Sequence, residues 1–479
     1  MNKIPALRIS NLTFRYYEHS KKNIIENLSL SIETGSVNVI LGRSGCGKST
    51  LAAVAAGLYP ENGGVISNGE IEIFGHSIRN MTHKERAGYL TLMFQNPELQ
   101  FCMNTVRKEI IFCLENIAVQ PNKMDEIIFN TASKLGISDL LDKKLSTLSG
   151  GEKQKVSLCC LLALGSKCII LDEAFANIDR ESTCEIINLL KLYKNSGGTI
   201  IAIEHNPEIW KTLADRYILI GECCKILEEN ILPSEFDNYR EFLASKGIYG
   251  SYTGRNFFRK TQTENIISLK NFSVKNFSPS GEYILKNTSV DFKKNRITAL
   301  IGKSGIGKTT TFLCILRQHP FEGTIEINGQ NIKKLKERDL FSMIGIVFQN
   351  PANQFVAQKL SEEIMTGISD SIQPEYLDKL ISDYGLKEFL KYSPYMLSQG
   401  QQRRLAVLSI VLGKQKIILL DEPTYGQDLQ TTEAIMKQLN KKVEHENLTV
   451  IFITHDEQLA NKWADNIIKI ENQKFVSVK

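Results

Sequence analysis

The chain has 479 residues and a formal net charge of +5, which leaves room for two domains of about 200–250 residues, each with its own core. The charge is too small to indicate a nucleic-acid-binding protein. No window of about 18 consecutive apolar residues predicts a membrane span, and residues 1–10 lack the apolar core of a secretory signal. Ten scattered cysteines without a C-x-x-C spacing indicate reduced thiols rather than disulfides or a zinc site.

The first predicted elements are two half-buried strands. Apolar and polar side chains alternate over 7–16 and again over 27–32, as they do in strands with one buried face. Tyr16, which ends the first run, and Tyr17 lie before the second strand. Either ring could stack on an adenine base, with Tyr16 the favoured candidate, or pack locally, and the sequence leaves both interpretations open.

A phosphate-binding pattern, G-x-x-x-x-G-K-[ST], follows the apolar run 37–41 and precedes a helix-forming run over 51–56. Its glycines allow successive N–H groups to turn toward phosphate oxygens, and the helix start presents its positive end to the same anion. We expect Lys48 to reach the β- and γ-phosphates and Ser49 to bind Mg²⁺. The predicted nucleotide-binding residues of this loop are Gly42, Arg43, Ser44, Gly45, Cys46, Gly47, Lys48, Ser49 and Thr50.

Polar side chains then end several predicted strands. An alternating strand is expected over 69–75, bounded by glycines, and Gln95 ends a buried strand, where it either ligates Mg²⁺ or caps a turn. Asp172 and Glu173 end a wholly apolar strand, where active groups of parallel sheets gather. We expect Asp172 to hold the Mg²⁺ shell and Glu173 to polarise the attacking water. His205 ends the next buried strand, where it would contact the γ-phosphate.

Ser149 and Glu152 form a capping box at the start of a helical run over 153–164. A helix start with a serine hydroxyl and a glycine, here Gly151, is also an anion site. Both interpretations rest on the same residues. The chain continues with a predicted helix over 234–244 and a glycine-bearing segment over 248–263 that we interpret as a linker.

The whole set of motifs occurs twice. The second phosphate loop lies 308 − 48 = 260 residues after the first, and the second carboxylate pair lies 421 − 172 = 249 residues after its counterpart. We therefore expect one domain over 1–247 and another over 264–479. The second loop comprises Gly302, Lys303, Ser304, Gly305, Ile306, Gly307, Lys308, Thr309 and Thr310. The other second-copy candidates are Gln349 and Asp421 for the metal together with Thr309, Glu422 and His455 for catalysis, and Ser398 and Gly400 at the helix start.

Strands that alternate with helices predict a mostly parallel α/β sheet. The order of the motifs resembles the ATP-binding-cassette (ABC) ATPases over nearly the whole chain. The resemblance implies two P-loop NTPase domains of RecA-like fold, each with a helical subdomain that carries the signature motif. It also implies two bound ATP molecules with Mg²⁺, held between the domains in a head-to-tail pair formed within one chain. Asp179 and Asp428 occupy the position of the D-loop aspartate.

By the same resemblance, one site combines the first phosphate loop with Ser398 and Gly400, and the other combines the second loop with Ser149 and Gly151. Gln399 replaces the first glycine of the second signature motif. The two sites are therefore expected to be chemically unequal, although both keep the residues needed to hydrolyse ATP.

A finer resemblance, to the ATPases of energy-coupling-factor (ECF) importers, rests on 95–101, 349–355 and 422–428. It implies ATP hydrolysis coupled to import of a vitamin, metal ion or similar micronutrient, and no nucleic-acid partner. The expected partners are an integral membrane scaffold (T-type) and a small substrate-binding membrane protein (S-type), with the chain peripheral on the cytoplasmic face. Segments 95–105 and 349–360 are the expected docking surface.

Three alternatives stay open. A soluble tandem ABC protein that acts on ribosomes would share the motif order, although such proteins typically carry a long charged helical linker. The tandem ATPase of a sugar importer would require a periplasmic-type binding protein. A structural role with inactive sites is the third, and the intact glutamates argue against it.

Overall fold

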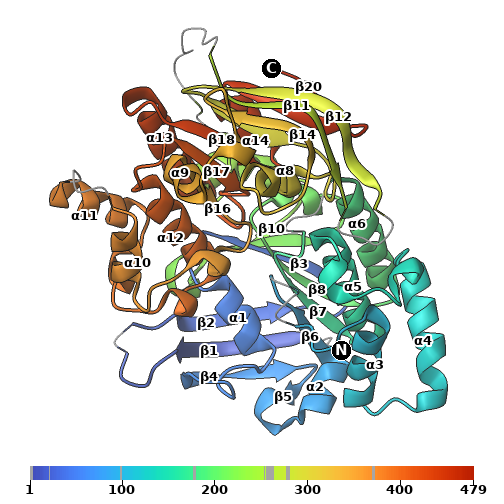
Figure 1. Cartoon of the computed structure of the whole chain (residues 1–479). Coiled ribbons are helices and arrows are strands. Elements are labelled where there is room, and N and C mark those ends of the chain that lie inside the picture. Colours follow the sequence, from blue (N-terminus) through green and yellow to red (C-terminus); the bar gives the residue numbers. More distant parts are fainter. Residues whose placement is uncertain are drawn as a thin grey trace. The chain divides into compact units, whose positions relative to one another are not determined.

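The computed structural model describes residues 4–20, 22–95, 97, 100–175, 180–252, 254, 264–276, 281–368 and 373–479. The chain divides into two compact units, Met1–Gly250 and Ser251–Lys479 (Figure 1). Each unit contains one four-stranded and one six-stranded sheet, and the strands follow the same order in both. The predicted duplication of an α/β domain is thus confirmed as a duplication of fold.

The six-stranded sheet of the first unit is parallel apart from its edge strand β10, and its order is β10-β9-β3-β8-β7-β6. Every residue of β3, β7 and β8 is buried, as expected for parallel strands covered on both faces. The strands are β3 (Val37–Gly42), β6 (Leu90–Met93), β7 (Cys168–Asp172), β8 (Thr199–Glu204), β9 (Arg216–Ile220) and β10 (Ile226–Ile231).

Two cores lie on the two faces of this sheet. Along β8, the side chains of Ile200 and Ala202 lie in the core between the sheet and the helices. Those of Ile201 and Ile203 lie in the core between this sheet and the antiparallel sheet. The alternation follows from the pleat, which turns successive side chains to opposite faces. Because both faces are packed, the strand ends and the loops after them hold fixed positions for a site.

The antiparallel sheet of the first unit has the order β2-β1-β4-β5. Its strands are β1 (Leu7–Arg15), β2 (Ile25–Ile32), β4 (Val65–Ile73) and β5 (His76–Ser77). The prediction that Gly69 bounds a strand is wrong, since Gly69 lies inside β4 with φ of +94°. A Cβ there would approach the Ser10 carbonyl oxygen to 2.6 Å, so glycine permits the close approach to β1 rather than ending the strand.

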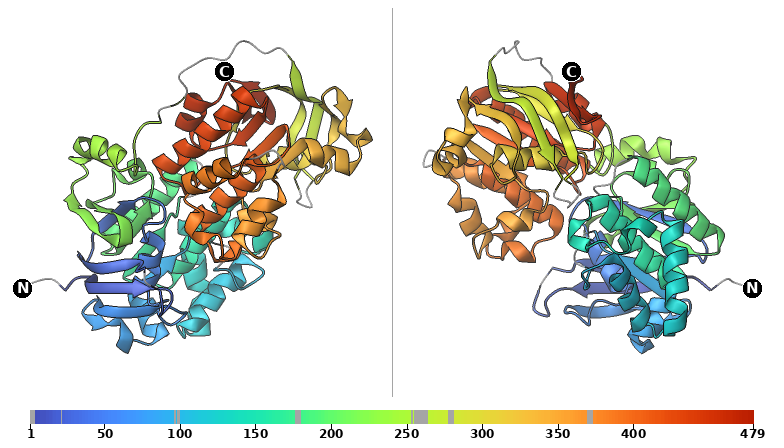
Figure 2. Two further views of the ribbon diagram at one scale, coloured as in Figure 1. Left: turned by 90° about the vertical axis from the view of Figure 1, so that its left-hand side faces the viewer. Right: turned by 45° about the vertical axis from the view of Figure 1, so that its right-hand side comes forward.

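Helices α3, α4 and α5 pack together into the helical layer, and Figure 2 shows them away from the blue antiparallel sheet. The helix expected over 234–244 is instead a 3₁₀ turn (Phe236–Tyr239) followed by the short α7. The helices are α1 (Lys48–Ala55), α2 (His83–Tyr89), α3 (Val106–Asn116), α4 (Pro121–Lys134), α5 (Gly150–Ala163), α6 (Arg180–Asn195) and α7 (Arg240–Ser245).

The second unit repeats this plan, with sheet orders β12-β11-β14-β15 and β16-β17-β18-β13-β19-β20. Its strands are β11 (Asn265–Lys275), β12 (Tyr283–Lys293), β13 (Ile297–Ile301), β14 (Glu322–Ile327), β15 (Gln330–Asn331), β16 (Ile344–Val347), β17 (Ile417–Asp421), β18 (Thr449–Ile453), β19 (Asn466–Glu471) and β20 (Lys474–Ser477). Its helices are α8 (Lys308–Ile315), α9 (Glu337–Met343), α10 (Leu360–Thr366), α11 (Pro374–Asp383), α12 (Gln399–Val411), α13 (Leu429–His445) and α14 (Glu457–Trp463).

The segment expected to be a linker is partly packed. Ile248 is buried in the helix-side core of the first unit, and the Tyr252 hydroxyl donates a hydrogen bond to Asp456 Oδ2 at 2.6 Å in the second. Residues 253 and 255–263 lie outside the described residues. Among the residues that the structure describes, no helix combines the length and apolar character needed to cross a membrane.

Candidate active sites

The first phosphate loop joins β3 to α1. The Lys48 ammonium donates to the carbonyl oxygens of Gly42 at 2.7 Å and Arg43 at 2.9 Å. Gly45 and Gly47 adopt φ of +80° and +108°, which turns the backbone as an anion cradle requires. Binding of a triphosphate would exchange the two carbonyl acceptors of Lys48 for phosphate oxygens.

Gly47 is restricted by space as well as by its dihedral angle. A Cβ at Gly47 would lie 2.7 Å from Cys224 Sγ and 3.0 Å from the Ile24 carbonyl oxygen, whereas a Cβ at Gly45 would meet nothing within 4 Å. Cys224 belongs to a 3₁₀ turn, and its own backbone N–H donates to the Cys46 carbonyl oxygen at 3.1 Å. The loop is therefore supported from behind by this turn, and Cys46 is itself buried.

Tyr16 lies against the end of this loop. Its hydroxyl and Thr50 Oγ1 are 2.6 Å apart, and its ring meets Phe14 and Tyr59 edge-on at centroid distances of 5.4 and 5.5 Å. Burial raises the pKa of Tyr16. These contacts place the ring beside the nucleotide loop, and adenine stacking stays a prediction.

Glu173 is the centre of a polar cluster in the first unit. The Gln95 amide donates to Glu173 Oε2, and His205 Nε2 lies 3.0 Å from Glu173 Oε1. Burial opposes ionisation, but His205 and the charge of Lys48 lower the pKa of Glu173. Glu173 also adopts a left-handed backbone with φ of +50°, a strained conformation that is often found at functional sites.

Asp172 lies beside the Ser49 hydroxyl, which hydrogen-bonds to it. Burial and the neighbouring Glu173 raise the pKa of Asp172 to about 7, and its Oδ1 is buried with no hydrogen-bond partner. Within the described ranges no group of three or more His, Cys, Asp and Glu side chains forms a metal cage. A carboxylate oxygen without a partner next to a hydroxyl fits Mg²⁺, which keeps several waters and shares its shell with substrate phosphates.

The second unit places the corresponding residues in the same way. Lys308 donates to the carbonyl oxygens of Gly302 at 2.7 Å and Lys303 at 2.9 Å, and Thr309 Oγ1 donates to Asp421 Oδ2 at 2.7 Å. His455 Nε2 lies 3.4 Å from Glu422 Oε1.

Glu422 resembles Glu173 in backbone conformation, but its pKa is shifted in the opposite direction. It is left-handed at φ of +52°, and burial raises its pKa to about 8. The structure thus brings the predicted catalytic and metal residues of each copy to one edge of the sheet.

The signature residues lie at the starts of α5 and α12. Glu152 N donates to Ser149 Oγ at 3.4 Å and Gln401 N donates to Ser398 Oγ at 3.3 Å, so both serines cap their helices. Gly151 is buried in the first turn of α5. The Gln427 amide donates to the Gly400 carbonyl oxygen at 3.1 Å.

Gln399 is the first residue of α12, and its substitution for glycine leaves the capping box intact. Asp428 caps α13 by accepting from Thr431 N at 2.8 Å. Asp179 lies outside the described residues.

Arg403 is a site residue that the sequence reasoning missed. From α12, its guanidinium donates to the backbone carbonyl oxygens of Glu422 and, at 2.5 Å, of Gln349. It also lies over the Tyr425 ring at 4.8 Å. The first copy has Gln154 at this position, and that difference between the copies was the signal available in the sequence.

Two buried carboxylates were also missed. Glu109 Oε2 accepts from Cys102 N at 2.9 Å and Met103 N at 2.7 Å. Glu363 Oε2 accepts in the same way from Val356 N at 2.9 Å and Ala357 N at 2.8 Å. Each carboxylate fixes the segment that follows the predicted metal-binding glutamine of its own unit, Gln95 or Gln349. In both copies the residue directly after the glutamate is an isoleucine.

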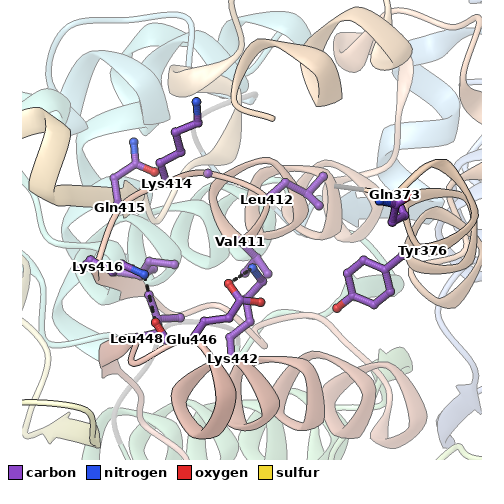
Figure 3. Close-up of a pocket in the computed structure, with 12 residues that line it drawn as sticks. Gln373, Tyr376, Val411, Leu412, Lys414, Gln415, Lys416, Lys442, Glu446 and Leu448 are labelled. Carbon is purple, nitrogen blue, oxygen red and sulfur yellow. Dashed lines mark hydrogen bonds and ion pairs between the residues drawn. The ribbon is translucent and has the colours of Figure 1, made fainter. Parts of the chain in front are cut away.

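A pocket of about 500 Å³ in the second unit lies between the ends of α11, α12 and α13 (Figure 3). Lys442 Nζ donates to Glu446 Oε2 at 2.8 Å and Lys416 Nζ donates to the Glu446 carbonyl oxygen at 3.0 Å. Its described lining contains none of the predicted nucleotide-binding residues, so this pocket is separate from the candidate sites.

A glycine loop between a buried strand and a helix, with carboxylates at the neighbouring strand ends, is the arrangement of P-loop nucleoside triphosphatases. The chain belongs to the ABC transporter family, whose model matches residues 25–176 and 285–425. It is therefore a tandem ABC ATPase that binds and hydrolyses ATP.

The chain is similar to named proteins over nearly its whole length. It is 32% identical to the "Putative HMP/thiamine import ATP-binding protein YkoD" of Bacillus subtilis, across 97% of this chain and 90% of that protein. It is 30% identical to a "Putative ABC transporter ATP-binding protein" of Saccharolobus solfataricus, across 98% of this chain and 93% of that one.

Solved structures share its fold. The RNase-L inhibitor aligns with a TM-score of 0.64 at 18% identity, across 98% of this chain and 91% of that one. The archaeal ribosome recycling factor aABCE1, solved in complex with ribosomal stalk protein aP1, aligns with a TM-score of 0.63 at 18% identity, across 96% of this chain and 87% of that one.

Proposed function

We propose that this chain is the energy-coupling ATPase of an ECF-type membrane importer for a vitamin, metal ion or similar micronutrient. The observation that carries the proposal is the end-to-end similarity to a protein named for HMP/thiamine import. The chain would act as a peripheral protein on the cytoplasmic face of the membrane. Its partners would be an integral scaffold (T-type) and a small substrate-binding membrane protein (S-type).

The residues of each cluster suit separate tasks in hydrolysis. Lys48 and Lys308 would bind the β- and γ-phosphates, and Glu173 and Glu422 would polarise the attacking water. His205 and His455 would contact the γ-phosphate.

Magnesium would supply charge neutralisation at the phosphate oxygens. Asp172 with Ser49 and Gln95 would hold it in the first copy, and Asp421 with Thr309 and Gln349 would hold it in the second. Two observations support this assignment. Asp172 Oδ1 is buried without a hydrogen-bond partner, and the Ser49 and Thr309 hydroxyls are hydrogen-bonded to Asp172 and Asp421, respectively.

We further propose that the two units pair head-to-tail, so that each bound ATP also touches Ser149 and Gly151, or Ser398 and Gly400, of the other unit. Shifting such a pair from 1:99 to 99:1 closed requires about 5.5 kcal/mol of differential binding. Charge-assisted hydrogen bonds from two opposing helix starts are of that order. Hydrolysis would remove the bridge, and reopening would drive the membrane partner through segments 95–105 and 349–360.

The test is to tag the full chain, solubilise the cell membranes in mild detergent, purify the chain and identify what accompanies it. A multi-span scaffold together with a small membrane protein is the expected result. Ribosomal subunits without membrane proteins would instead establish the soluble ribosome-acting alternative. A membrane pair that depends on a periplasmic-type binding protein would establish the sugar importer.

A further inference from the structure

The second unit exposes four large apolar side chains on the segments that precede and follow α10, which hydrogen bonds hold together. The exposed fractions are 80% for Val356, 59% for Tyr395, 58% for Met396 and 40% for Tyr392. We call these four residues the second-unit face. Large apolar side chains grouped in this way indicate an interaction surface rather than scattered surface residues.

The second-unit face is held in place by the backbone beneath it. The Tyr395 hydroxyl donates to the Phe355 carbonyl oxygen at 3.1 Å, and Leu360 N donates to the Tyr392 carbonyl oxygen at 2.9 Å. Glu363, only 4% exposed, accepts from Val356 N and Ala357 N. These bonds join residues from both sides of α10, so the surface exists before any partner binds.

The first unit has the same backbone arrangement at the corresponding positions. Glu109, 3% exposed, accepts from Cys102 N and Met103 N, and Val106 N donates to the Lys143 carbonyl oxygen at 3.3 Å. Because the same hydrogen bonds occur in both units, they show which residue of one unit corresponds to which residue of the other. The four positions that correspond to the second-unit face, which we call the first-unit face, are Cys102, Lys143, Ser146 and Thr147.

The two faces differ in chemistry. All four residues of the first-unit face are exposed, and Lys144 beside them is exposed as well. The positive charge of the nearby Arg107 is balanced by Asp142, because Arg107 Nε lies 3.0 Å from Asp142 Oδ1. The first-unit face is therefore cationic and polar, whereas the second-unit face is aromatic and aliphatic.

We infer that the membrane partner contacts the two units through two segments of different chemistry, an acid-bearing segment on the first-unit face and an apolar segment on the second-unit face. The inference rests on the proposed function, because it concerns the partner expected there. A carboxylate placed against Val356 and Tyr395 would lose its hydration without gaining a partner, and an apolar segment over Lys143 would desolvate an ammonium. One repeated segment therefore cannot satisfy both faces.

Exchange of one face for the other provides the test, since the chain supplies its own matched controls. The first variant rewrites the second-unit face as the first-unit face, with the substitutions Val356→Cys, Tyr392→Lys, Tyr395→Ser and Met396→Thr. The reciprocal variant carries Cys102→Val, Lys143→Tyr, Ser146→Tyr and Thr147→Met. Lys143→Glu and Tyr395→Ser alone serve where a fourfold variant fails to fold, and the ATPase activity of the purified chain, which none of these residues supports directly, reports folding.

The readout is the amount of membrane partner recovered with each tagged full-length chain from the same detergent-solubilised membranes. Interface positions of this kind dominate binding energy, so each exchange should reduce recovery about 30-fold or more. In the wild-type complex, a zero-length carbodiimide cross-linker should join Lys143 or Lys144 to a carboxylate of the partner, and mass spectrometry locates that carboxylate.

Undiminished recovery with both exchange variants would overturn the inference while leaving the importer assignment in place. Cross-links to a second copy of this chain, or recovery that changes with lipid headgroup rather than with the partner, would overturn it as well. If the wild-type chain brings ribosomal subunits and no membrane protein, the proposed function itself fails. The two failures are distinguished by the wild-type sample alone.

Discussion

Arg403 shows how one side chain can join three parts of a site. Its guanidinium connects α12 to the carbonyl oxygens that follow β16 and β17. Hydrogen bonds to charged groups contribute about 1.5–3 kcal/mol each. We therefore predict that Arg403→Gln, which installs the residue found at Gln154, destabilises the second unit by about 2–4 kcal/mol and lowers ATP turnover.

Denaturant unfolding and steady-state ATPase assays check this prediction. Arg403→Lys is the control, because lysine keeps the charge but lacks the planar fork that reaches two carbonyl oxygens. It should fall between the wild type and Arg403→Gln. Equal stability of all three proteins would show that Arg403 does not support the site.

Glu204 is a buried carboxyl at the end of β8, and its counterpart is Thr454. Burial and the neighbouring Glu173 raise its pKa to about 8. Because the folded state then holds a proton that the unfolded state has released, the free energy of unfolding should fall as pH rises from about 4.5 to about 8.

Asp172 and Glu422 also have raised pKa values and add to the fall over the same pH range. Glu204→Gln should therefore remove only the part that Glu204 contributes, up to about 4 kcal/mol between pH 5 and pH 8. Urea unfolding of both proteins at pH 5 and pH 8 measures it. Parallel pH profiles for the wild type and Glu204→Gln would contradict the assignment of the titration to Glu204.

At the scale of elements, the phosphate loop contains glycines that are required for two different reasons, a positive φ and the lack of space for a Cβ. Gly45 needs only a positive φ, whereas Gly47 needs a positive φ and an empty Cβ position next to Cys224 and Ile24. We predict that Gly45→Ala destabilises the first unit by about 1–2 kcal/mol and that Gly47→Ala destabilises it more and weakens ATP binding more.

The second unit offers a replicate of this comparison. A Cβ at Gly307 would lie 2.7 Å from Ile284 Cγ2, whereas a Cβ at Gly305 would meet nothing within 4 Å. Thermal unfolding and nucleotide binding, measured for all four alanine variants, should give the same order in both units. Equal effects at the two glycines would show that the space behind the loop is not limiting.

Elements whose signal is local were predictable. The phosphate loop, the buried strands that end at Asp172 and Asp421, and the capping boxes at Ser149 and Ser398 each depend on residues a few positions apart. The placement of Gly69 failed because its conformation is set by the close approach of β1, which lies more than 50 residues away.

The contacts of Arg403, Glu109 and Glu363 could not be predicted for a related reason. Each of these side chains is charged and lies on a helix, where the common expectation is exposure to solvent. Arg403 is buried because carbonyl oxygens 19 and 54 residues away accept its hydrogen bonds, and only the folded chain brings those segments together. Glu109 and Glu363 are buried because the backbone six and seven residues before each of them turns back and donates two N–H groups, a turn that the spacing of residue types does not reveal. Comparison of the two copies position by position could have singled out Arg403 against Gln154.

At the scale of the whole molecule, two domains of the same fold carry different chemistry. Their strand orders and phosphate loops agree. They differ at Gln399 against Gly150, at Arg403 against Gln154, and at Thr454 against Glu204. A duplication that keeps the backbone while the site surroundings diverge gives two ATP sites that need not work at the same rate.

Replacement of the glutamates tests both the assignment and this inequality. We predict that the double variant Glu173→Gln with Glu422→Gln keeps ATP binding, loses turnover and accumulates a closed form, because glutamine preserves the shape of the side chain but cannot polarise the attacking water. Loss of such a group lowers rates by about 10²–10⁴-fold. Each single variant should also lose activity. The factors should differ because Gln95 donates to the Glu173 carboxylate, whereas Arg403 holds the backbone of Glu422.

Equilibrium ATP binding, steady-state turnover and small-angle scattering with and without ATP measure the three properties on the full chain. ATP should contract the double variant to a stable compact form and the wild type only transiently. Wild-type turnover in the double variant would refute the catalytic assignment, whereas identical losses in the two single variants would refute the inequality of the sites. A double variant that neither binds ATP nor contracts would place these glutamates in nucleotide binding rather than in hydrolysis.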